Sequence, residues 1–323
     1  MVQAAERQIL FSGCLQARDG TPPRDATLAL IQRLGVDMML EAPQGGCCGA
    51  RADKRMSDRA RADTLAPIYD AAGRGLDIVC LSPACRRVVG AFAPRPTPEH
   101  PHPIQVFDVT QLLVDVYGLT RLNSAVQHGL VGLPVAIHPI CHFNHNAMVR
   151  EQFLTGHRIG QALANLTALA SGATTLRRML LMREYGAVVR STAPVEPGLA
   201  TSLRRILTGL GATISADVSR SGRCSEVPLP AGRPSRFARR TRPAPCLQAA
   251  ADSGAEVLVT PCYLCYAGLN GQQSALASSH PARRVSVLHL SQIAGLACEI
   301  DPKKLGLARS AVSPRRALSH YIA

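Results

Sequence analysis

Short apolar runs alternate along the chain with segments whose apolar residues recur at helical spacing. The runs that predict strands lie at 8–14, 76–82, 134–141 and 256–260, and each leads into a cysteine. Segments that predict helices lie between them at 27–34, 59–73 and 203–210. Strands and helices in alternation favour an α/β fold, with small and mostly parallel sheets flanked by helices.

The second half of the chain repeats landmarks of the first half in the same order. A strand-like run ends at Cys14 and again at Cys141, and a helix ends at a glycine, Gly35 or Gly211. The cysteine turns before Cys85 and Cys265, and the segments 106–113 and 287–294, form further matching pairs. We therefore predict two pseudo-symmetric tandem domains, 1–128 and 129–323, joined near 122–133.

The two halves differ in length. Cys14 lies 21 positions before Gly35, whereas Cys141 lies 70 positions before Gly211, so the second half carries about 49 additional residues. Apolar residues among basic ones predict a helical insertion at about 148–195. The segment 228–245 is rich in proline and arginine and is typical of a solvated loop.

Composition narrows the class of protein. The chain has 323 residues, of which 46% are hydrophobic, so it can bury a sizeable core. It has no apolar run long enough to span a membrane and a poor signal peptide, which predicts a soluble, cytoplasmic protein without a membrane span. The net charge of +14 predicts an acidic partner or an anionic substrate. Aromatic residues are only 4% and tryptophan is missing, which disfavours nucleic-acid binding.

Eight of the 11 cysteines form two sets of four, one in each half. The predicted metal ligands are Cys14, Cys47, Cys48 and Cys85 in the first half, and Cys141, Cys224, Cys262 and Cys265 in the second. Thiolates that converge from several strand ends suit zinc or iron–sulfur clusters. The side chains of Cys47 and Cys48 diverge, which favours a multinuclear iron–sulfur cluster and leaves zinc as an alternative at one site.

The remaining cysteines and His142 have simpler interpretations. Cys80, Cys246 and Cys298 lack counterparts in the repeat and are predicted to be buried apolar residues. A Cys141–His142 nucleophilic pair is disfavoured, because neighbours in sequence seldom reach that geometry. His142 is better interpreted as a donor beside cluster sulfur.

Several motifs together carry a resemblance to a known family. They are Gly45–Gly49, Ser82–Cys85, His138–His142, Gly222–Cys224, Pro261–Cys265 and the ending 287–307. With them the chain resembles the cysteine-rich CCG-domain family, and most closely the B-type subunits of heterodisulfide reductases. The resemblance implies two tandem CCG domains, each with one [4Fe-4S] cluster of the noncubane or the conventional type.

The resemblance also implies a function. It indicates thiol/disulfide or sulfane-sulfur redox chemistry on an anionic sulfur substrate. The chemistry would take place in a heterodisulfide-reductase-like complex that also contains a ferredoxin-like (C-type) and a flavin-containing (A-type) subunit. The alternative is a non-catalytic electron-transfer or structural subunit, of the type associated with lactate or glycolate oxidation or with succinate dehydrogenase.

The sequence departs from the family pattern once in each half. The family motif has five cysteines, but Ser82 replaces one in the first half and Arg223 replaces one in the second. Four thiolates per half favour a conventional cluster over a noncubane one. We expect Ser82, His142 and Arg223 to act as additional ligands or neighbours of the clusters. The charge of Arg223 should raise a cluster's reduction potential or hold an anionic substrate.

Overall fold

The computed structural model describes residues 8–11, 21–36, 38–39, 65–66, 68–69, 76–93, 104–139, 197–218, 221, 245–276 and 284–322. The chain divides into one unit of residues 1–141 and 198–323 and a second unit of residues 142–197, and the description below concerns the first. The predicted insertion at 148–195 and nearly all of the Arg-rich segment 228–245 lie outside the described residues. The predicted boundary at 128/129 stays a prediction.

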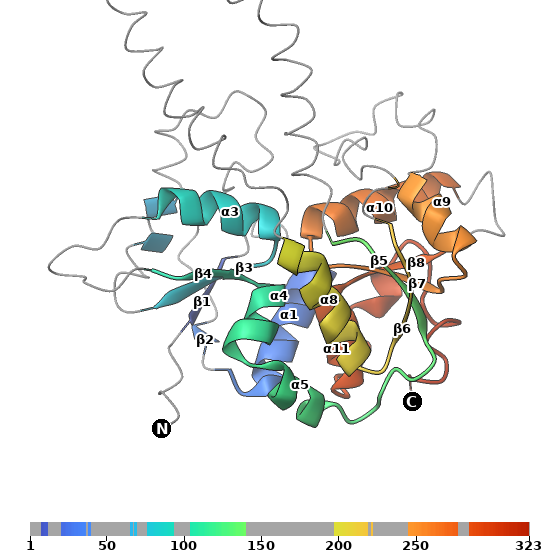
Figure 1. Cartoon of the computed structure of the whole chain (residues 1–323), viewed down its shortest axis with the longest axis horizontal. Helices are drawn as coiled ribbons and strands as arrows, with labels where there is room; N and C mark the ends of the chain where they lie inside the picture. The colour runs from blue at the N-terminus through green and yellow to red at the C-terminus, as the bar shows by residue number, and fades with distance from the viewer. Residues whose placement is uncertain are drawn as a thin grey trace, which may run out of the picture. The chain divides into compact units, whose positions relative to one another are not determined.

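Two four-stranded sheets form the framework, and every neighbouring strand pair in them is parallel (Figure 1). The first sheet has the order β2 (Met38–Met39), β1 (Gln8–Phe11), β3 (Asp77–Cys80), β4 (Val106–Asp108). The second has the order β6 (Thr213–Asp217), β5 (Pro134–Ile137), β7 (Val257–Thr260), β8 (Ser286–His289). Within each half the strands therefore lie in the same spatial order, second, first, third and fourth. The α/β prediction is confirmed.

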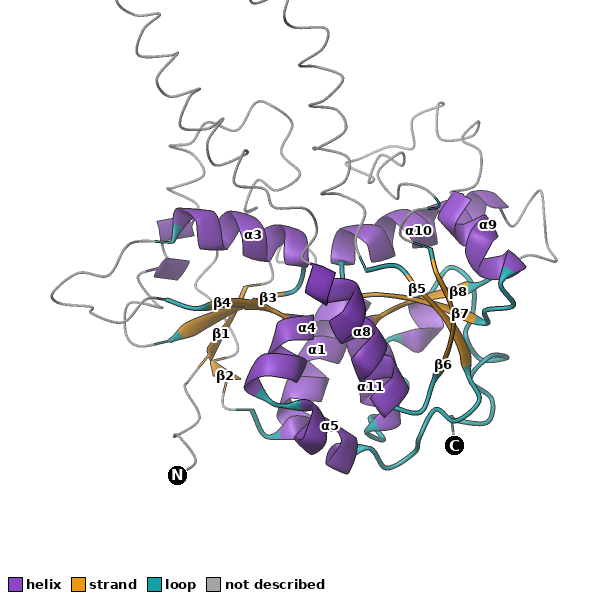
Figure 2. Cartoon of the chain, in the orientation of Figure 1, coloured by secondary structure: helices purple, strands orange, loops and turns teal. Residues whose placement is uncertain are grey.

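Helices cover both faces of the sheets (Figure 2). The first half contributes α1 (Pro22–Leu34), α3 (Pro83–Phe92), α4 (Val109–Gln111) with the π-helix η2 (Leu112–Val116), and α5 (Leu119–Ala125). The second half contributes α8 (Pro197–Gly209), α9 (Pro245–Asp252), α10 (Tyr263–Leu276), α11 (Leu290–Ala297) and the 3-10 helix η6 (Leu307–Arg309). Equivalent pairs are α1 with α8, α3 with α10, and α4 with α11. Each pair follows equivalent strands.

Glycines follow the ends of α1 and α8, as the sequence predicts. Gly35 ends α1 in the left-handed conformation, with φ 64°, and its N–H donates to the carbonyls of Gln32 and Ile31. Gly211 follows α8 with φ 94°, so both predicted end glycines adopt a backbone conformation that other residues resist. Helix α1 begins at Pro22, five residues before the predicted start, because proline suits the first positions of a helix.

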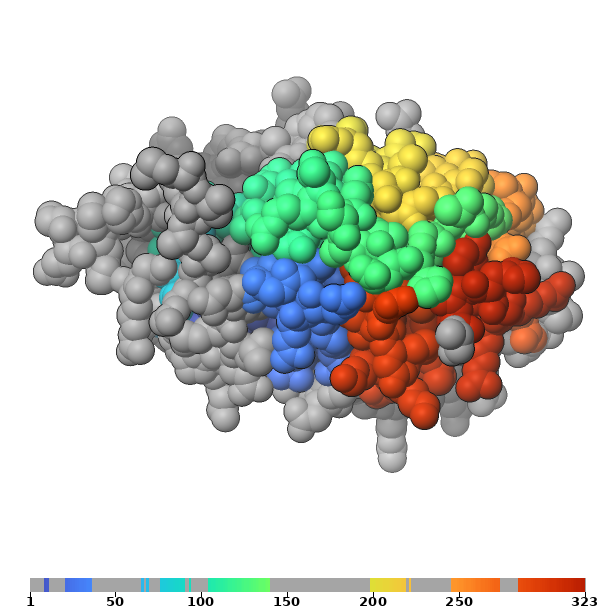
Figure 3. Space-filling view, turned by 90° about the horizontal axis from the view of Figure 1, so that it is seen from below, coloured from blue at the N-terminus to red at the C-terminus, as the bar shows by residue number. Residues whose placement is uncertain are grey.

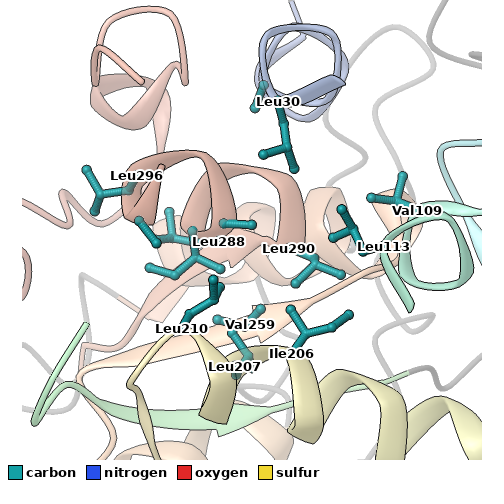
Figure 4. Close-up of a cluster of buried hydrophobic side chains, with 14 of the residues drawn as sticks. Leu30, Val109, Leu113, Ile206, Leu207, Leu210, Val259, Leu288, Leu290 and Leu296 are labelled. Carbon is teal, nitrogen blue, oxygen red and sulfur yellow. The ribbon is translucent and has the colours of Figure 1, made fainter. Parts of the chain in front are cut away.

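One hydrophobic core joins the two halves. It contains side chains from both sheets and from α1, α4, α8 and α11, including Leu30, Leu113, Leu207 and Leu290 (Figure 4). Helices α1 and α11 pack directly against each other although they come from different halves. Seen from below, α1, the segment after β4, α8 and the C-terminal segment lie side by side (Figure 3). This shared core therefore fixes the cysteine turns of the two halves relative to each other.

A smaller apolar cluster lies on the opposite face of the first sheet. It contains Ile9, Phe11, Ile78, Cys80, Cys85 and Val89. Strand residues alternate between this cluster and the large core: Leu10 and Val79 belong to the core, whereas their chain neighbours belong to the small cluster. Phe11 and Cys80, each the last residue of its strand, therefore lie in the same cluster as Cys85.

Candidate functional site

The two described cysteine turns lie just beyond the carboxyl ends of β3 and β7, the edge where open α/β sheets bind ligands. Cys85 lies in the first turn of α3 and Cys265 in the first turn of α10. Ser82 and Cys262 occupy the position directly before each helix. Their carbonyls accept equivalent first helical hydrogen bonds, from Arg86 N–H at 3.0 Å and Tyr266 N–H at 2.9 Å. The two turns are therefore built alike.

The two turns meet at these equivalent positions. The hydroxyl oxygen of Ser82 lies 3.2 Å from the sulfur of Cys262, and both residues are buried. Ser82 Oγ also accepts a hydrogen bond from Ala84 N–H at 3.2 Å, which caps α3. In the other turn Thr260 Oγ1 accepts from Cys262 N–H at 3.2 Å. Residues 180 positions apart in sequence thus form one polar contact inside the protein.

A buried histidine lies between the turns. The Nε2 atom of His289 lies 3.0 Å from the carbonyl oxygen of Pro261, and the backbone of Leu81 is a further hydrogen-bond partner of the ring. The other ring nitrogen, Nδ1, accepts from Ser291 N–H at 3.3 Å, which caps α11 and leaves the proton on Nε2 to donate. Burial lowers the pKa of His289 to about 4, although the backbone groups of Pro261 and Leu81 oppose this shift. The ring is therefore neutral near pH 7.

The equivalent position of the first half is Asp108. Its carboxylate accepts from Thr110 N–H at 2.8 Å and from Gln111 N–H at 3.2 Å, and so caps α4. Burial raises the pKa of Asp108, against the opposing charge of Arg86 and the capping hydrogen bonds. Sequence reasoning missed Asp108 and His289 as site residues. The signal that could have found them is the capping pattern, a polar residue three positions before Gln111 or Gln292.

His138 is a third residue whose importance only the structure shows. It follows β5, its ring is completely buried, and neither ring nitrogen has a hydrogen-bond partner among the residues that the structure describes. Its backbone N–H donates to the Val259 carbonyl at 2.9 Å, which places it beside the end of β7. Val135 and Ile137 face the large core, so His138 faces the other side of the sheet. The repeat aligns it with Phe11, which lies in the apolar cluster of the first half.

The buried ring of His138 is one observation that tests whether a metal or cluster fits this edge of the second sheet. A buried polar group without a partner costs about 1–3 kcal/mol, so native structures seldom retain one unless something binds it. Cys262 and Cys265 in this half are fully buried, and Cys85 of the first half is buried as well. Buried thiols and an imidazole at one sheet edge fit an iron–sulfur or zinc group in their donor chemistry.

The structure describes only part of the predicted ligand set. Cys85, Cys262, Cys265 and Ser82 are described, whereas Cys14, Cys47, Cys48, Cys141, Cys224, His142 and Arg223 lie outside the described residues. Among the described residues, no three histidine, cysteine or acidic side chains gather closely enough to hold a metal ion. The complete ligand sets therefore stay a prediction. Cys80, Cys246 and Cys298 are buried, as predicted.

Comparison with known families finds a match in the first half of the chain. Residues 9–88 match the family model CCG, a cysteine-rich domain. The match spans β1 to the middle of α3 and supports the CCG-domain family to which the motifs point. It does not reach the second half, so a second CCG domain remains a proposal.

The chain is also similar in sequence to one characterised protein. The chain is 34% identical over 113 residues to the 8-methylmenaquinol:fumarate reductase membrane anchor subunit of Wolinella succinogenes. The aligned region covers 35% of this chain and 39% of the relative, so the chain spans about two fifths of the length of that protein. The two likenesses are thus to a cysteine-rich domain family and to a subunit of a fumarate reductase. Across the helices that the structure describes, none has the length and apolar character that crossing a membrane requires.

Proposed function

We propose that this protein is an iron–sulfur subunit of a multi-subunit oxidoreductase. In each half, the four predicted cysteines would hold one [4Fe-4S] cluster, with zinc as the alternative at one site. The observation that carries the proposal is the meeting of two equivalent, buried cysteine turns at the edges of two parallel sheets. The contact between Ser82 and Cys262 brings these turns together.

The residues of the chain have distinct roles in this proposal. Cys85, Cys262 and Cys265 would supply thiolates, and bound clusters would supply one-electron transfer. The first turns of α3 and α10 add the partial positive charge of helix N-termini, which favours thiolate ligands. Burial of the turns excludes water, and the hydrogen bond from His289 holds the peptide before Cys262.

The finer proposal is chemistry of the heterodisulfide reductase B type. Cleavage of a disulfide needs two electrons, and two half-sites that each transfer one electron could serve a single substrate. The adjacent turns suit this requirement, because Ser82 and Cys262 belong to different halves and touch. Electrons would pass between this chain and two partners, one ferredoxin-like and one flavin-containing. The net charge of +14 would favour an anionic sulfur substrate or an acidic partner.

The likeness to the fumarate reductase component favours a second candidate function. In that case the chain would transfer electrons within a respiratory type of complex without binding a sulfur substrate. The loss of one cysteine per half supports this candidate, because it removes a ligand from each family motif.

Metal analysis with matched variants tests the proposal. The protein is purified anaerobically, and iron, sulfide and zinc are counted for the wild type, Cys262→Ser and Cys246→Ser. Cys246 is equally buried but has no counterpart in the repeat, so its variant controls for loss of a buried thiol. We expect Cys262→Ser to lose about half of the iron and Cys246→Ser to keep it. Stoichiometric zinc with little iron in the wild type would refute the proposal.

Electron paramagnetic resonance separates the two candidate functions. Oxidised protein is treated with a thiol and its spectrum is compared with that of untreated protein. A new signal that depends on the thiol supports sulfur chemistry at a cluster. An unchanged spectrum in iron-replete protein supports the electron-transfer role.

A further inference from the structure

The substitution that removes a ligand from the first half adds a hydrogen-bond donor to the second. Ser82 stands where the family motif has cysteine, and its hydroxyl lies 3.2 Å from Cys262 Sγ. We propose that Ser82 is a positioning residue of the second-half site, where it donates a hydrogen bond to the sulfur of Cys262 and raises the reduction potential of a cluster held there. This inference rests on the proposed iron–sulfur function.

The direction of the hydrogen bond follows from the proton count. A hydroxyl has one proton and two lone pairs, and one lone pair of Ser82 Oγ already accepts the Ala84 N–H. A metal-bound Cys262 is a thiolate and has no proton to give. The Ser82 hydroxyl is then the only donor of the pair, and its proton points to sulfur.

Burial makes this hydrogen bond effective. The exposed fraction is 2% for Ser82 and 0% for Cys262, so water does not compete for either atom. In a medium of low dielectric a hydrogen bond to a charged sulfur is stronger than in water. Hydrogen bonds to the sulfur ligands are among the features that set cluster potentials, because they stabilise the more negative, reduced state.

The surrounding structure holds the two atoms in place. His289 contacts the backbone of Leu81, which precedes Ser82, and its Nε2–H donates to Pro261, which precedes Cys262. The hydrogen bonds accepted by the hydroxyls of Ser82 and Thr260 fix the turns on either side. The two atoms therefore meet through a supported arrangement of both turns. The cysteine turn of the first half thus supplies a hydrogen-bond donor to the site of the second half.

Three variants isolate the hydrogen bond to sulfur. Ser82→Gly removes the hydroxyl yet keeps most of the capping strength, because glycine costs only a few tenths of a kcal/mol at an N-cap. Ser82→Thr keeps the hydroxyl and should restore the wild-type behaviour. Thr260→Val is the matched control: it removes a hydroxyl from the other turn, whose described hydrogen bond is to the Cys262 backbone N–H and not to the sulfur.

The first measurement is a redox titration of anaerobically purified protein, followed by electron paramagnetic resonance. We expect the midpoint potential of one cluster to shift to more negative values in Ser82→Gly. It should stay near the wild-type value in Ser82→Thr and Thr260→Val. Equal iron content in the four proteins ensures that the shift reports the hydrogen bond rather than loss of the cluster.

The second measurement observes the proton itself. Electron–nuclear double resonance in H₂O and D₂O should reveal an exchangeable proton coupled to the cluster in the wild type, Ser82→Thr and Thr260→Val. That coupling should vanish in Ser82→Gly. Iron-replete Ser82→Gly with unchanged potential and coupling would overturn this inference and leave the proposed function intact. Wild-type protein without iron would overturn both.

Discussion

Acid should destabilise this protein through one buried residue, His289. In the folded protein its ring is enclosed and burial lowers its pKa to about 4, whereas an unfolded histidine has a pKa near 6.5. As the pH falls below about 6.5, the unfolded chain binds a proton here that the folded protein rejects until about pH 4. The free energy of unfolding must therefore decrease across this window.

The magnitude follows from the difference between the two pKa values. Each pH unit between them is worth about 1.4 kcal/mol, so the full loss between pH 6.5 and pH 4 is about 3 kcal/mol. The residue is completely buried, so solvent screening does not reduce this figure. Below about pH 4 both states are protonated and the contribution of His289 no longer changes.

Urea unfolding at a series of pH values measures the effect, with circular dichroism and tyrosine fluorescence as probes. His289→Asn keeps a capping side chain for α11 but removes the titration. It should lower stability at pH 7, through loss of the hydrogen bond to Pro261, and flatten the pH dependence between 6.5 and 4 by about 3 kcal/mol.

An exposed histidine provides the control for this experiment. His320→Asn makes the same replacement at an exposed side chain and is measured alongside His289→Asn. Iron content is measured at each pH, since loss of bound metal also alters stability. Identical pH dependence of wild type and His289→Asn would refute the reasoning.

Three further predictions concern stability. His138→Phe, which copies the residue of the first half, should raise the unfolding free energy of the iron-free protein by about 1 kcal/mol in urea titrations, because an unpartnered buried ring is removed; a loss of stability would contradict this. Leu290→Ala in the shared core should cost about 2–5 kcal/mol, against less than about 0.5 kcal/mol for Val131→Ala at an exposed site, and equal effects would argue against one core for both halves. Gly35→Ala should cost about 1 kcal/mol through backbone strain alone, since nothing lies within 4 Å of an added methyl group, and a stabilised variant would rule out the left-handed conformation.

The sequence was informative where structure is local. Apolar runs and helical periodicity predicted the α/β class, four of the strands and the order of landmarks in each half, because burial on both faces of a parallel strand demands a continuous apolar run. The end of α1 at Gly35 was also predictable, because only the local backbone decides it. Helix α1 starts earlier than helical periodicity predicts, because prolines occupy its first positions.

The polar residues of the interior could not be found from the apolar pattern. Asp108 and His289 interrupt apolar runs and would ordinarily be assigned to the surface. They are buried because each caps a helix that begins at the end of a strand. The unpartnered ring of His138 is likewise a property of its surroundings, not of its neighbours in sequence.

The amino-acid pattern alone was enough to predict the class of fold, the repeated order of landmarks and the cysteine turns that follow the strands. The contact between the turns of the two halves, with Ser82 against Cys262 and His289 between them, is visible only in the folded protein. The physical reason is distance along the chain. Local patterns specify strands, helices and caps, whereas the contact of residues 180 positions apart depends on how α1, α4, α8 and α11 pack into one core.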